Sequence, residues 1–374
     1  MMKEKVEKGE EILVSTTRLK HPFFSIVMPS YNAEKYISRA VKSIMEQTFA
    51  DYELIIVNDG STDHTLYVAK ELKKADSRIR IVDLRQNGGL AHARNVGTDY
   101  ASGNYIWYMD ADDYVESYLL ESVYNSLQGN PVQLLMFGLY EEYFDKSGNC
   151  IRTNVSKPEY RFYNNRKEIR QSIIEYEQNL LIGYAWNKIF NLAYLREKRL
   201  AFLDIPLIED ALFVYTFLRD IDTMTVLDIV PYHYEKKVDT NLTNAFVPTY
   251  FKVHRKRILS LYKLHEYWGL ITPEFESQLG SLYARYILSA AERTFDKRAH
   301  MSYRRRIVWI NRLYKDFLYQ RLVKGARPKE SRTLFWAITI MKTENALLLT
   351  TAAYAVHIAR KYFPWVYIVF KEGR

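Results

Sequence analysis

The chain has 374 residues and a formal net charge of +9, with 48% hydrophobic and 26% charged residues. This composition excludes a disordered or fibrous protein, and the length suits one large domain with an appendage or two modest domains. The single cysteine, Cys150, excludes an intrachain disulfide framework and a cysteine-based metal cage, and it is compatible with a reducing cytoplasm.

The charge is divided unevenly along the chain. Residues 250–374 hold 24 Lys and Arg against 9 Asp and Glu, a net charge of +15, whereas residues 1–249 hold 29 against 35, a net charge of −6. An acidic front and a basic C-terminal region need separate explanations. We therefore expect three parts: a polar extension over 1–22, a main domain over 23–248, and a basic, aromatic-rich helical region over 249–374.

The front of the main domain alternates apolar runs with amphipathic segments. The apolar runs, which are typical of strands buried on both faces, cover residues 24–29, 52–57, 79–84 and 105–109. The segments with the apolar spacing of helices cover residues 33–48, 62–74 and 90–101. This alternation predicts an α/β fold with a mostly parallel, Rossmann-like sheet flanked by helices, in which ligands lie beyond the carboxyl ends of the strands.

Beyond residue 118 the alternation weakens. Residues 132–140 have the pattern of another strand, 165–182 and 211–218 that of helices, and from about 249 onward the pattern is helical throughout. No secretion signal is visible. The longest uncharged apolar stretch of the C-terminal region, Ala346–Ala359, has 14 residues, fewer than the roughly 20 that a membrane span needs.

An acidic cluster follows the fourth predicted strand. Asp110, Asp112 and Asp113 lie within four residues, and such carboxylates repel one another unless a cation is present. Mg²⁺ or Mn²⁺, which prefer oxygen ligands, would relieve the repulsion. A solvated turn that caps the next helix explains the same residues, so the cluster alone leaves both interpretations open.

The other strand ends also carry polar groups, each of them ambiguous when taken alone. They are Pro29–Asn32, Asn58–Gly60 and Gln86–Gly88. Asp59 and Asn87 fit ordinary turns, and Arg94 fits a solvated helix position. No GxGxxG or phosphate-binding P-loop follows the first strand, which argues against a dinucleotide site.

Taken together, the four motifs are specific. PSYN at 29–32, VNDGSTD at 57–63, the NGG…ARN stretch at 87–95 and DADD at 110–113 occur in this order and spacing. The chain thereby resembles the family-2 inverting glycosyltransferases, which have the A-type nucleotide-diphospho-sugar fold, closely over 24–118 and more loosely to about 245. Within that family, the chain is most similar in type to the members that build bacterial capsules, exopolysaccharides or wall polymers.

The resemblance implies a reaction and a division of the main domain. A hexosyl or N-acetylhexosaminyl group would pass from a nucleoside-diphosphate donor, UDP being expected, to a hydroxyl of a glycan or lipid-linked glycan in one metal-dependent displacement. The nucleotide-sugar half would cover about 23–118 and the acceptor half about 119–248. A sugar nucleotidyltransferase, and a non-catalytic binding protein on the same scaffold, are the alternatives.

The resemblance also implies roles for individual residues on the donor side. Pro29 and Tyr31 would border the nucleobase, and Asp59 would bind the base or ribose. Asn87 and Arg94 would lie along the nucleotide. Asp110 would lie near the ribose or the metal, and Asp112 would be the main ligand of Mn²⁺ or Mg²⁺.

On the acceptor side, the family commonly takes its base from a Glu-Asp pair at a helix start. Here Asp210 would be the base and Glu209 an acceptor-binding or orienting residue, although an acidic helix cap needs no catalytic role. Trp186 could stack on a sugar and Lys188 could reach the diphosphate or acceptor, against purely structural roles. His233 could complete a metal shell, but packing beside its tyrosines is the simpler interpretation, and we do not count it as a ligand.

The basic C-terminal region admits several partners. Apolar stretches at 333–341, 346–359 and 362–370 lie among basic residues, with Arg304–Arg306 upstream. This pattern suits peripheral attachment to an anionic membrane, at the inner face of the cell membrane, and it also suits a homodimer interface or a solvated helical face. Nucleic acid is disfavoured because charge is its only support.

Overall fold

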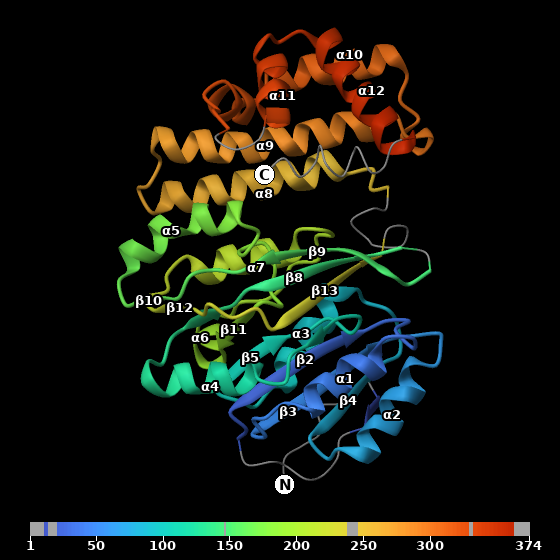
Figure 1. Cartoon of the computed structure of the whole chain (residues 1–374), viewed down its shortest axis with the longest axis vertical. Helices are drawn as coiled ribbons and strands as arrows, with labels where there is room; N and C mark the ends of the chain where they lie inside the picture. The colour runs from blue at the N-terminus through green and yellow to red at the C-terminus, as the bar shows by residue number, and fades with distance from the viewer. Residues whose placement is uncertain (1–10, 14–20, 146, 238–245, 329–331, 363–374) are drawn as a thin grey trace. The chain divides into compact units, whose positions relative to one another are not determined.

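The computed structural model describes residues 11–13, 21–145, 147–237, 246–328 and 332–362 (Figure 1). The chain divides into two compact units, which are described separately. The first unit comprises Met1–Ile169 and Asn179–Leu242, and the second comprises Arg170–Gln178 and Thr243–Arg374.

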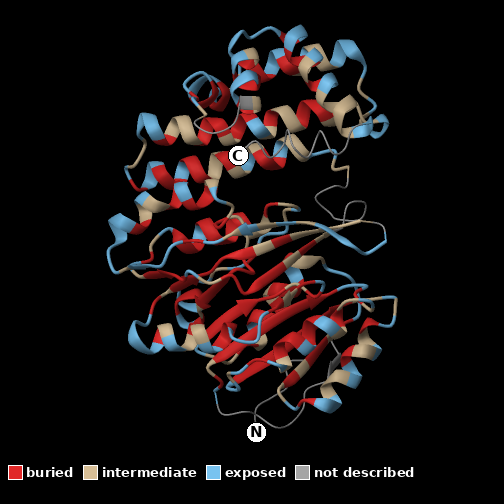
Figure 2. Cartoon of the chain, in the orientation of Figure 1, coloured by how far each residue is buried: buried red, intermediate tan, exposed pale blue. Residues whose placement is uncertain are grey.

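The first unit is built on a nine-stranded sheet in the order β1-β4-β3-β2-β5-β11-β7-β12-β10. Its centre consists of four parallel strands, β2 (Phe24–Ser30), β3 (Tyr52–Asp59), β4 (Ile79–Leu84) and β5 (Tyr105–Tyr108). Every residue of β2 and β3 is buried, as their uninterrupted apolar runs predict (Figure 2). The predicted α/β fold with a mostly parallel sheet is therefore confirmed.

Three helices follow the parallel strands: α1 (Ile37–Met45), α2 (Thr65–Ala75) and α3 (Leu90–Tyr100). Helix α3 packs on β2 and β3. At Gly97 of this helix an added Cβ would lie 2.3 Å from Val27 Cγ1, so only glycine permits this close approach. The packing sets the distance between α3 and the sheet, and with it the position of Arg94, one turn earlier.

The remaining strands of this sheet are shorter. β1 (Glu11–Leu13), inside the predicted polar extension, pairs antiparallel with β4. β11 (Lys188–Asn191) lies antiparallel between β5 and β7 (Leu134–Met136). β12 (Met224–Val226) and β10 (Arg161–Tyr163) complete the sheet.

A second sheet of four strands has the order β6-β13-β8-β9. Its strands are β6 (Tyr114–Val115), β13 (Tyr232–Lys237), β8 (Leu139–Phe144) and β9 (Cys150–Ser156). The single strand predicted over 132–140 is wrong, because the chain leaves one sheet after Met136 and enters the other at Leu139. Gly138 lies at this crossing, where a Cβ would be 2.4 Å from the Ser156 carbonyl oxygen.

The first unit also contains α4 (Leu119–Gly129), α6 (Leu192–Glu197) and α7 (Glu209–Leu218). α5 (Arg166–Gln178) begins in the first unit and continues into the second. In the second unit, a buried ion pair of 2.6 Å joins Glu177 near the end of α5 to Arg257 of α8 (Tyr250–Tyr267).

The second unit is helical over the residues that the structure describes. The long α9 (Pro273–Arg293) contacts α8, α11 (Arg332–Lys342) and α12 (Ala346–Tyr362), and α10 (Tyr303–Tyr314) contacts α12. Within the described residues no helix is both long and apolar enough to cross a membrane. Of the predicted apolar stretch 362–370, all but Tyr362 lies outside the described residues.

Candidate functional site

The ends of β2 and β3 are joined by side chains of the first two motifs. Asn32 Oδ1 accepts a hydrogen bond of 2.9 Å from the Thr62 backbone N–H, and Ser61 Oγ accepts one of 3.1 Å from the Asn32 N–H. Asn32 adopts a left-handed conformation (φ 49°), which asparagine tolerates better than most residues. These bonds leave the neighbouring Tyr31 ring 51% exposed beside the buried Pro29.

Asp59, the last residue of β3, organises the loop that follows β4. Its Oδ1 accepts from the Gly88 N–H (2.8 Å) and its Oδ2 from the Gly89 N–H (2.9 Å). The adjacent Gly60 has φ 65°, and a Cβ there would lie 2.6 Å from the Asn87 nitrogen. The structure thus brings Asp59 and the exposed Asn87 together at one edge of the sheet, with the Asp59 carboxylate directed at backbone N–H groups.

Arg94 connects two distant carboxylates. Its guanidinium is fully buried and donates to Asp110 Oδ1 at 2.9 Å and to Asp210 Oδ1 in a second ion pair. Asp210 Oδ2 accepts from the Ala185 N–H at 3.0 Å. Because Asp110 follows β5 and Asp210 begins α7, this arginine joins the end of the sheet to the N-terminus of that helix.

The three aspartates of the acidic cluster have different surroundings. Asp113 is buried and accepts hydrogen bonds from the Tyr232 hydroxyl (2.7 Å) and the Glu235 N–H (3.1 Å). Burial, with the charges of Asp112 and Asp110, raises the pKa of Asp113 well above its usual range. Asp112 lies at an exposed turn, where its carbonyl oxygen accepts from Arg39 at 2.9 Å. Asp113 is therefore a structural residue, and Asp110 and Asp112 remain at the surface of the site.

Asp110 and Asp112 fit a divalent cation by their chemistry. Burial raises the pKa of Asp110 to about 6; Asp210 and Asp112 add to the rise, while Arg94 opposes it. A cation would relieve the repulsion among these carboxylates. No three His, Cys, Asp or Glu side chains form a metal cage within the described residues, so a cation here would also need oxygen ligands from water or from a bound molecule.

Glu209 lies beside this group and has an unusual environment. Its Oε2 is buried and has no hydrogen-bond partner in the described part of the chain. Burial, together with the Asp210 charge, raises the pKa of Glu209 to about 7, although the Arg94 charge opposes the rise. A carboxyl group with a pKa near 7 can exchange a proton at neutral pH.

This raised pKa predicts that stability depends on pH. Below about pH 4.5 Glu209 is protonated in both the folded and unfolded chains, and between 4.5 and 7 only the folded chain keeps the proton. Its contribution to the free energy of unfolding therefore falls as pH rises through that window, by about 2–3 kcal/mol. Urea unfolding from pH 4 to 8 should show a smaller fall for Glu209→Gln than for the wild type. Glu168→Gln, at an exposed glutamate, should keep the wild-type dependence; a Glu209→Gln curve parallel to the wild type would contradict the assignment.

Trp186 and Lys188 both point into the protein. Lys188 is fully buried, and its ammonium donates to Leu181 O (2.5 Å), Tyr184 O (2.6 Å) and Asn187 Oδ1 (2.7 Å). Trp186 is 2% exposed and stacks on Tyr184 and Tyr232, with ring centroids 4.6 and 4.3 Å apart. The structure therefore brings neither side chain to an open surface. Both hold the segment 181–187, which includes the Ala185 N–H bonded to Asp210.

His233 lies in a separate cluster on the second sheet. Its ring stacks on Tyr114 and Tyr140, at centroid distances of 4.2 and 4.7 Å. Its ring nitrogens lie 3.1 Å from a Glu142 oxygen and 3.0 Å from a Glu116 oxygen. These contacts account for His233 by packing and ion pairing.

Two residues of the site are absent from the sequence-based prediction. Tyr232 bonds to Asp113 and stacks on Trp186, and the Phe202 ring lies 5.1 Å from the Arg94 guanidinium carbon. The position of Tyr232 beside His233 in an aromatic run is the only signal in the sequence that could have indicated it. Phe202 has no such signal.

Comparison with known proteins finds a family model that matches part of the chain. Residues 25–197 match the family described as Glycosyl transferase family 2. The chain is 28% identical over 251 residues to the uncharacterized glycosyltransferase EpsJ of Bacillus subtilis, an alignment that covers 67% of this chain and 71% of EpsJ.

Two solved structures share the fold. TarS 1-349 of S. aureus, in complex with UDP-GlcNAc, has a TM-score of 0.60 at 20% identity, covering 91% of this chain and 93% of that one. The mannosyltransferase PcManGT of Pyrobaculum calidifontis, in complex with GDP-Man and Mn²⁺, has a TM-score of 0.51 at 15% identity, covering 94% and 91%.

Proposed function

Because residues 25–197 are a glycosyltransferase family 2 domain, and the chain is accordingly a glycosyltransferase, we propose that it uses a UDP-linked sugar as donor. The sugar, a hexose or N-acetylhexosamine, would pass to a hydroxyl of a glycan or lipid-linked glycan. The reaction would be a single inverting displacement that depends on Mn²⁺ or Mg²⁺. The complex of TarS with UDP-GlcNAc supports the choice of a UDP-linked donor, and the complex of PcManGT with GDP-Man and Mn²⁺ supports the choice of cation.

The observation that carries the proposal is the position of Arg94 between Asp110 and Asp210. One guanidinium holds a carboxylate suited to a cation and another suited to act as a base. A glycosyl transfer needs both functions at one sugar carbon, one toward the leaving diphosphate and one toward the attacking hydroxyl.

On the donor side, the exposed Tyr31 and Asn87 would contact the nucleoside, with Pro29 and Asp59 shaping its site. Asp59 would act chiefly by fixing the loop at Gly88 and Gly89. Asp112 and Asp110 would hold the cation. When bound, that cation would offset the negative charge that the diphosphate gains as the glycosidic bond breaks.

On the acceptor side, Asp210 would be the base. Arg94 and the Ala185 N–H fix its carboxylate, and each of its oxygens retains a lone pair that could accept the proton of the acceptor hydroxyl. Its position in the first turn of α7 favours negative charge. Glu209 would bind or orient the same hydroxyl, while Trp186 and Lys188 would keep the segment 181–187 in place.

Calorimetric titration with UDP, with and without Mn²⁺, tests the donor site. We expect Mn²⁺ to increase the affinity of the wild type at least tenfold, about 1.4 kcal/mol, because Asp110 and Asp112 would hold a cation whose charge offsets that of the diphosphate. Asp112→Ala should lose this increment. Asp99→Ala, which removes an exposed carboxylate from the same domain, should retain it. Equal affinity of the wild type with and without Mn²⁺ would contradict the cation, and an absence of UDP binding would contradict the donor.

A further inference from the structure

Helix α10 presents a strongly basic face. Arg304, Arg305, Arg312 and Lys315 are exposed, and none has a carboxylate partner among the described residues. At 100° per residue, all four fall within an arc of about 100° around the helix. The exposed Val308, 49% accessible, lies inside the same arc. This arc on the helix surface is called the basic face below.

Local helix energetics do not explain this arrangement. Arg304 and Arg305 occupy the first turn of α10, which contains no acidic residue. The N-terminal end of a helix carries partial positive charge and disfavours cations. The two arginines therefore destabilise their own helix slightly, and the helix itself gives no reason for their position.

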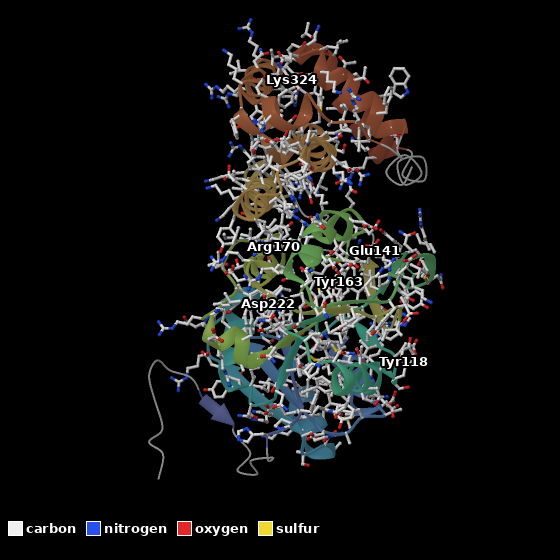
Figure 3. All side chains as sticks on the ribbon, turned by 90° about the vertical axis from the view of Figure 1, so that its left-hand side faces the viewer. Tyr118, Glu141, Tyr163, Arg170, Asp222 and Lys324 are labelled. Atoms are coloured by element: carbon white, nitrogen blue, oxygen red, sulfur yellow. The ribbon has the colours of Figure 1, made fainter. Side chains whose placement is uncertain are left out.

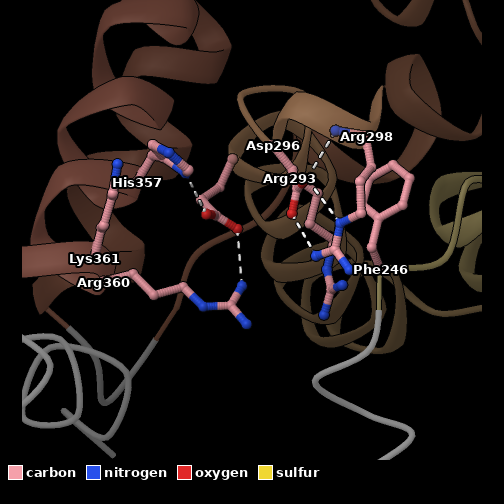
Figure 4. Close-up of a pocket in the computed structure, with 8 residues that line it drawn as sticks. Phe246, Arg293, Asp296, Arg298, His357, Arg360 and Lys361 are labelled. Atoms are coloured by element: carbon pink, nitrogen blue, oxygen red, sulfur yellow. Dashed lines mark hydrogen bonds and ion pairs between the residues drawn. The ribbon is translucent and has the colours of Figure 1, made fainter. Parts of the chain in front are cut away.

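Some other cations of the second unit, in contrast, are neutralised within it. Around a cavity of about 240 Å³ at the ends of α9 and α12, Glu292 pairs with His357 and Arg360, and Asp296 pairs with Arg298 (Figure 4). Lys324 likewise pairs with Glu344 at 3.0 Å (Figure 3). The four cations of the basic face have no such carboxylate partner among the described residues.

Exposed apolar side chains accompany this charge. They lie on α11 and on the first turn of α12: Phe335, Trp336, Leu347 and Leu348, with exposures of 48–64%. Two threonines on the same exposed surfaces bond internally, Thr339 to the Phe335 carbonyl (2.8 Å) and Thr351 to the Leu347 carbonyl (3.0 Å). Their hydroxyls are therefore satisfied within the helices, and the surface they share with these four residues is largely apolar.

Both surfaces belong to the same layer of helices. In the second unit α9 separates α8 from α10, α11 and α12, which lie on its other side (Figure 1). Short apolar segments beside unpaired cations are typical of proteins that lie in a membrane interface. A polyanion such as a nucleic acid would use the cations but would leave Trp336 and the leucines without a function.

We infer that the layer formed by α10, α11 and α12 binds the surface of an anionic lipid bilayer, with the basic face against phosphate headgroups and the apolar residues of α11 and α12 in the interface. We assign this partner because the positive charge of the basic face is complementary to the negative charge of the lipid headgroups. The inference does not depend on the proposed donor chemistry.

Vesicle flotation of the full-length protein tests the inference. We expect the wild type to float with phosphatidylglycerol-containing vesicles and not with pure phosphatidylcholine. Each cation near such a surface contributes about fivefold. Replacing Arg304, Arg305, Arg312 and Lys315 with glutamine should therefore lower the partition coefficient by about 100-fold or more. The matched control replaces four exposed lysines of the first unit, Lys42, Lys70, Lys157 and Lys167, with glutamine and should change it less than threefold.

A second variant tests the apolar contribution. Trp336→Phe should reduce the quenching of tryptophan fluorescence by brominated lipids, and Trp336→Ser should weaken vesicle binding about tenfold. Three outcomes would overturn the inference. The two four-residue variants could lose vesicle binding equally, or Trp336→Phe could leave the quenching of tryptophan fluorescence unchanged. The wild type could also bind duplex nucleic acid more tightly than the anionic vesicles. UDP affinity should be measured on the same samples. A variant that loses vesicle binding but retains UDP affinity then shows that the membrane surface and the donor site are tested independently.

Discussion

Replacing Asp210 with asparagine is expected to lower the turnover of sugar transfer by about 10²–10⁴-fold while UDP affinity stays within about threefold. An amide cannot take the proton from the attacking hydroxyl, so turnover should fall. The Asp210 side chain does not contact the donor in our proposal, so UDP affinity should hardly change. The measurement is steady-state transfer to an acceptor glycan, together with UDP titration of the same preparation.

The environment of Asp210 requires two controls for this experiment. The amide would also weaken the bonds to Arg94 and to the Ala185 N–H, so urea unfolding must show that the variant is folded under assay conditions. Asp228→Asn, at an exposed aspartate, should leave turnover unchanged. If Asp210→Asn retains turnover and Glu209→Gln abolishes it, the base is Glu209 and our assignment is wrong.

Replacing Arg94 with methionine is expected to lower the free energy of unfolding by about 3–5 kcal/mol. The methionine fills much of the same volume but leaves Asp110 and Asp210 without their shared cation. Urea denaturation at pH 7 measures the loss. Arg166→Met removes an exposed ion pair with Asp222 and should cost less than about 1 kcal/mol.

A triple variant distinguishes lost charge from lost packing. Adding Asp110→Asn and Asp210→Asn to Arg94→Met removes the unpaired carboxylates and should recover part of the stability. A cost for Arg94→Met as small as that for Arg166→Met would show that the buried ion pairs contribute little.

The parallel strands could be predicted because buried strands have a mainly apolar composition. The runs 24–29, 52–57 and 79–84 coincide closely with β2, β3 and β4, since strands inside a covered parallel sheet are mostly apolar. β1 could not be predicted in the same way. Three residues are too few to show a period, and their pairing with β4 is a tertiary event.

The site could be predicted in part, for a related reason. Motifs at strand ends meet because the parallel sheet aligns those ends, and this rule placed Asp59, Asn87 and Asp110 at one edge. The bond between Arg94 and Asp210 spans 116 residues, and no local pattern contains it. For Lys188 the prediction from residue type was misleading. A lysine suggested a charge that could reach a ligand, but its ammonium group is buried and donates to three protein acceptors, so its position is structural.

The ion pairs of Arg94 also constrain how this sequence can drift. If the arginine is lost first, two half-buried acids remain unpaired, and if either acid is lost first, the arginine keeps only one partner. Substitutions at 94, 110 and 210 are therefore strongly epistatic, so an intermediate is disadvantaged whichever position changes first. Descendant sequences should vary freely at exposed positions outside the site, such as Lys42 and Lys70, long before they vary at these three positions, and a library that randomises the three together should recover mainly charge-balanced combinations.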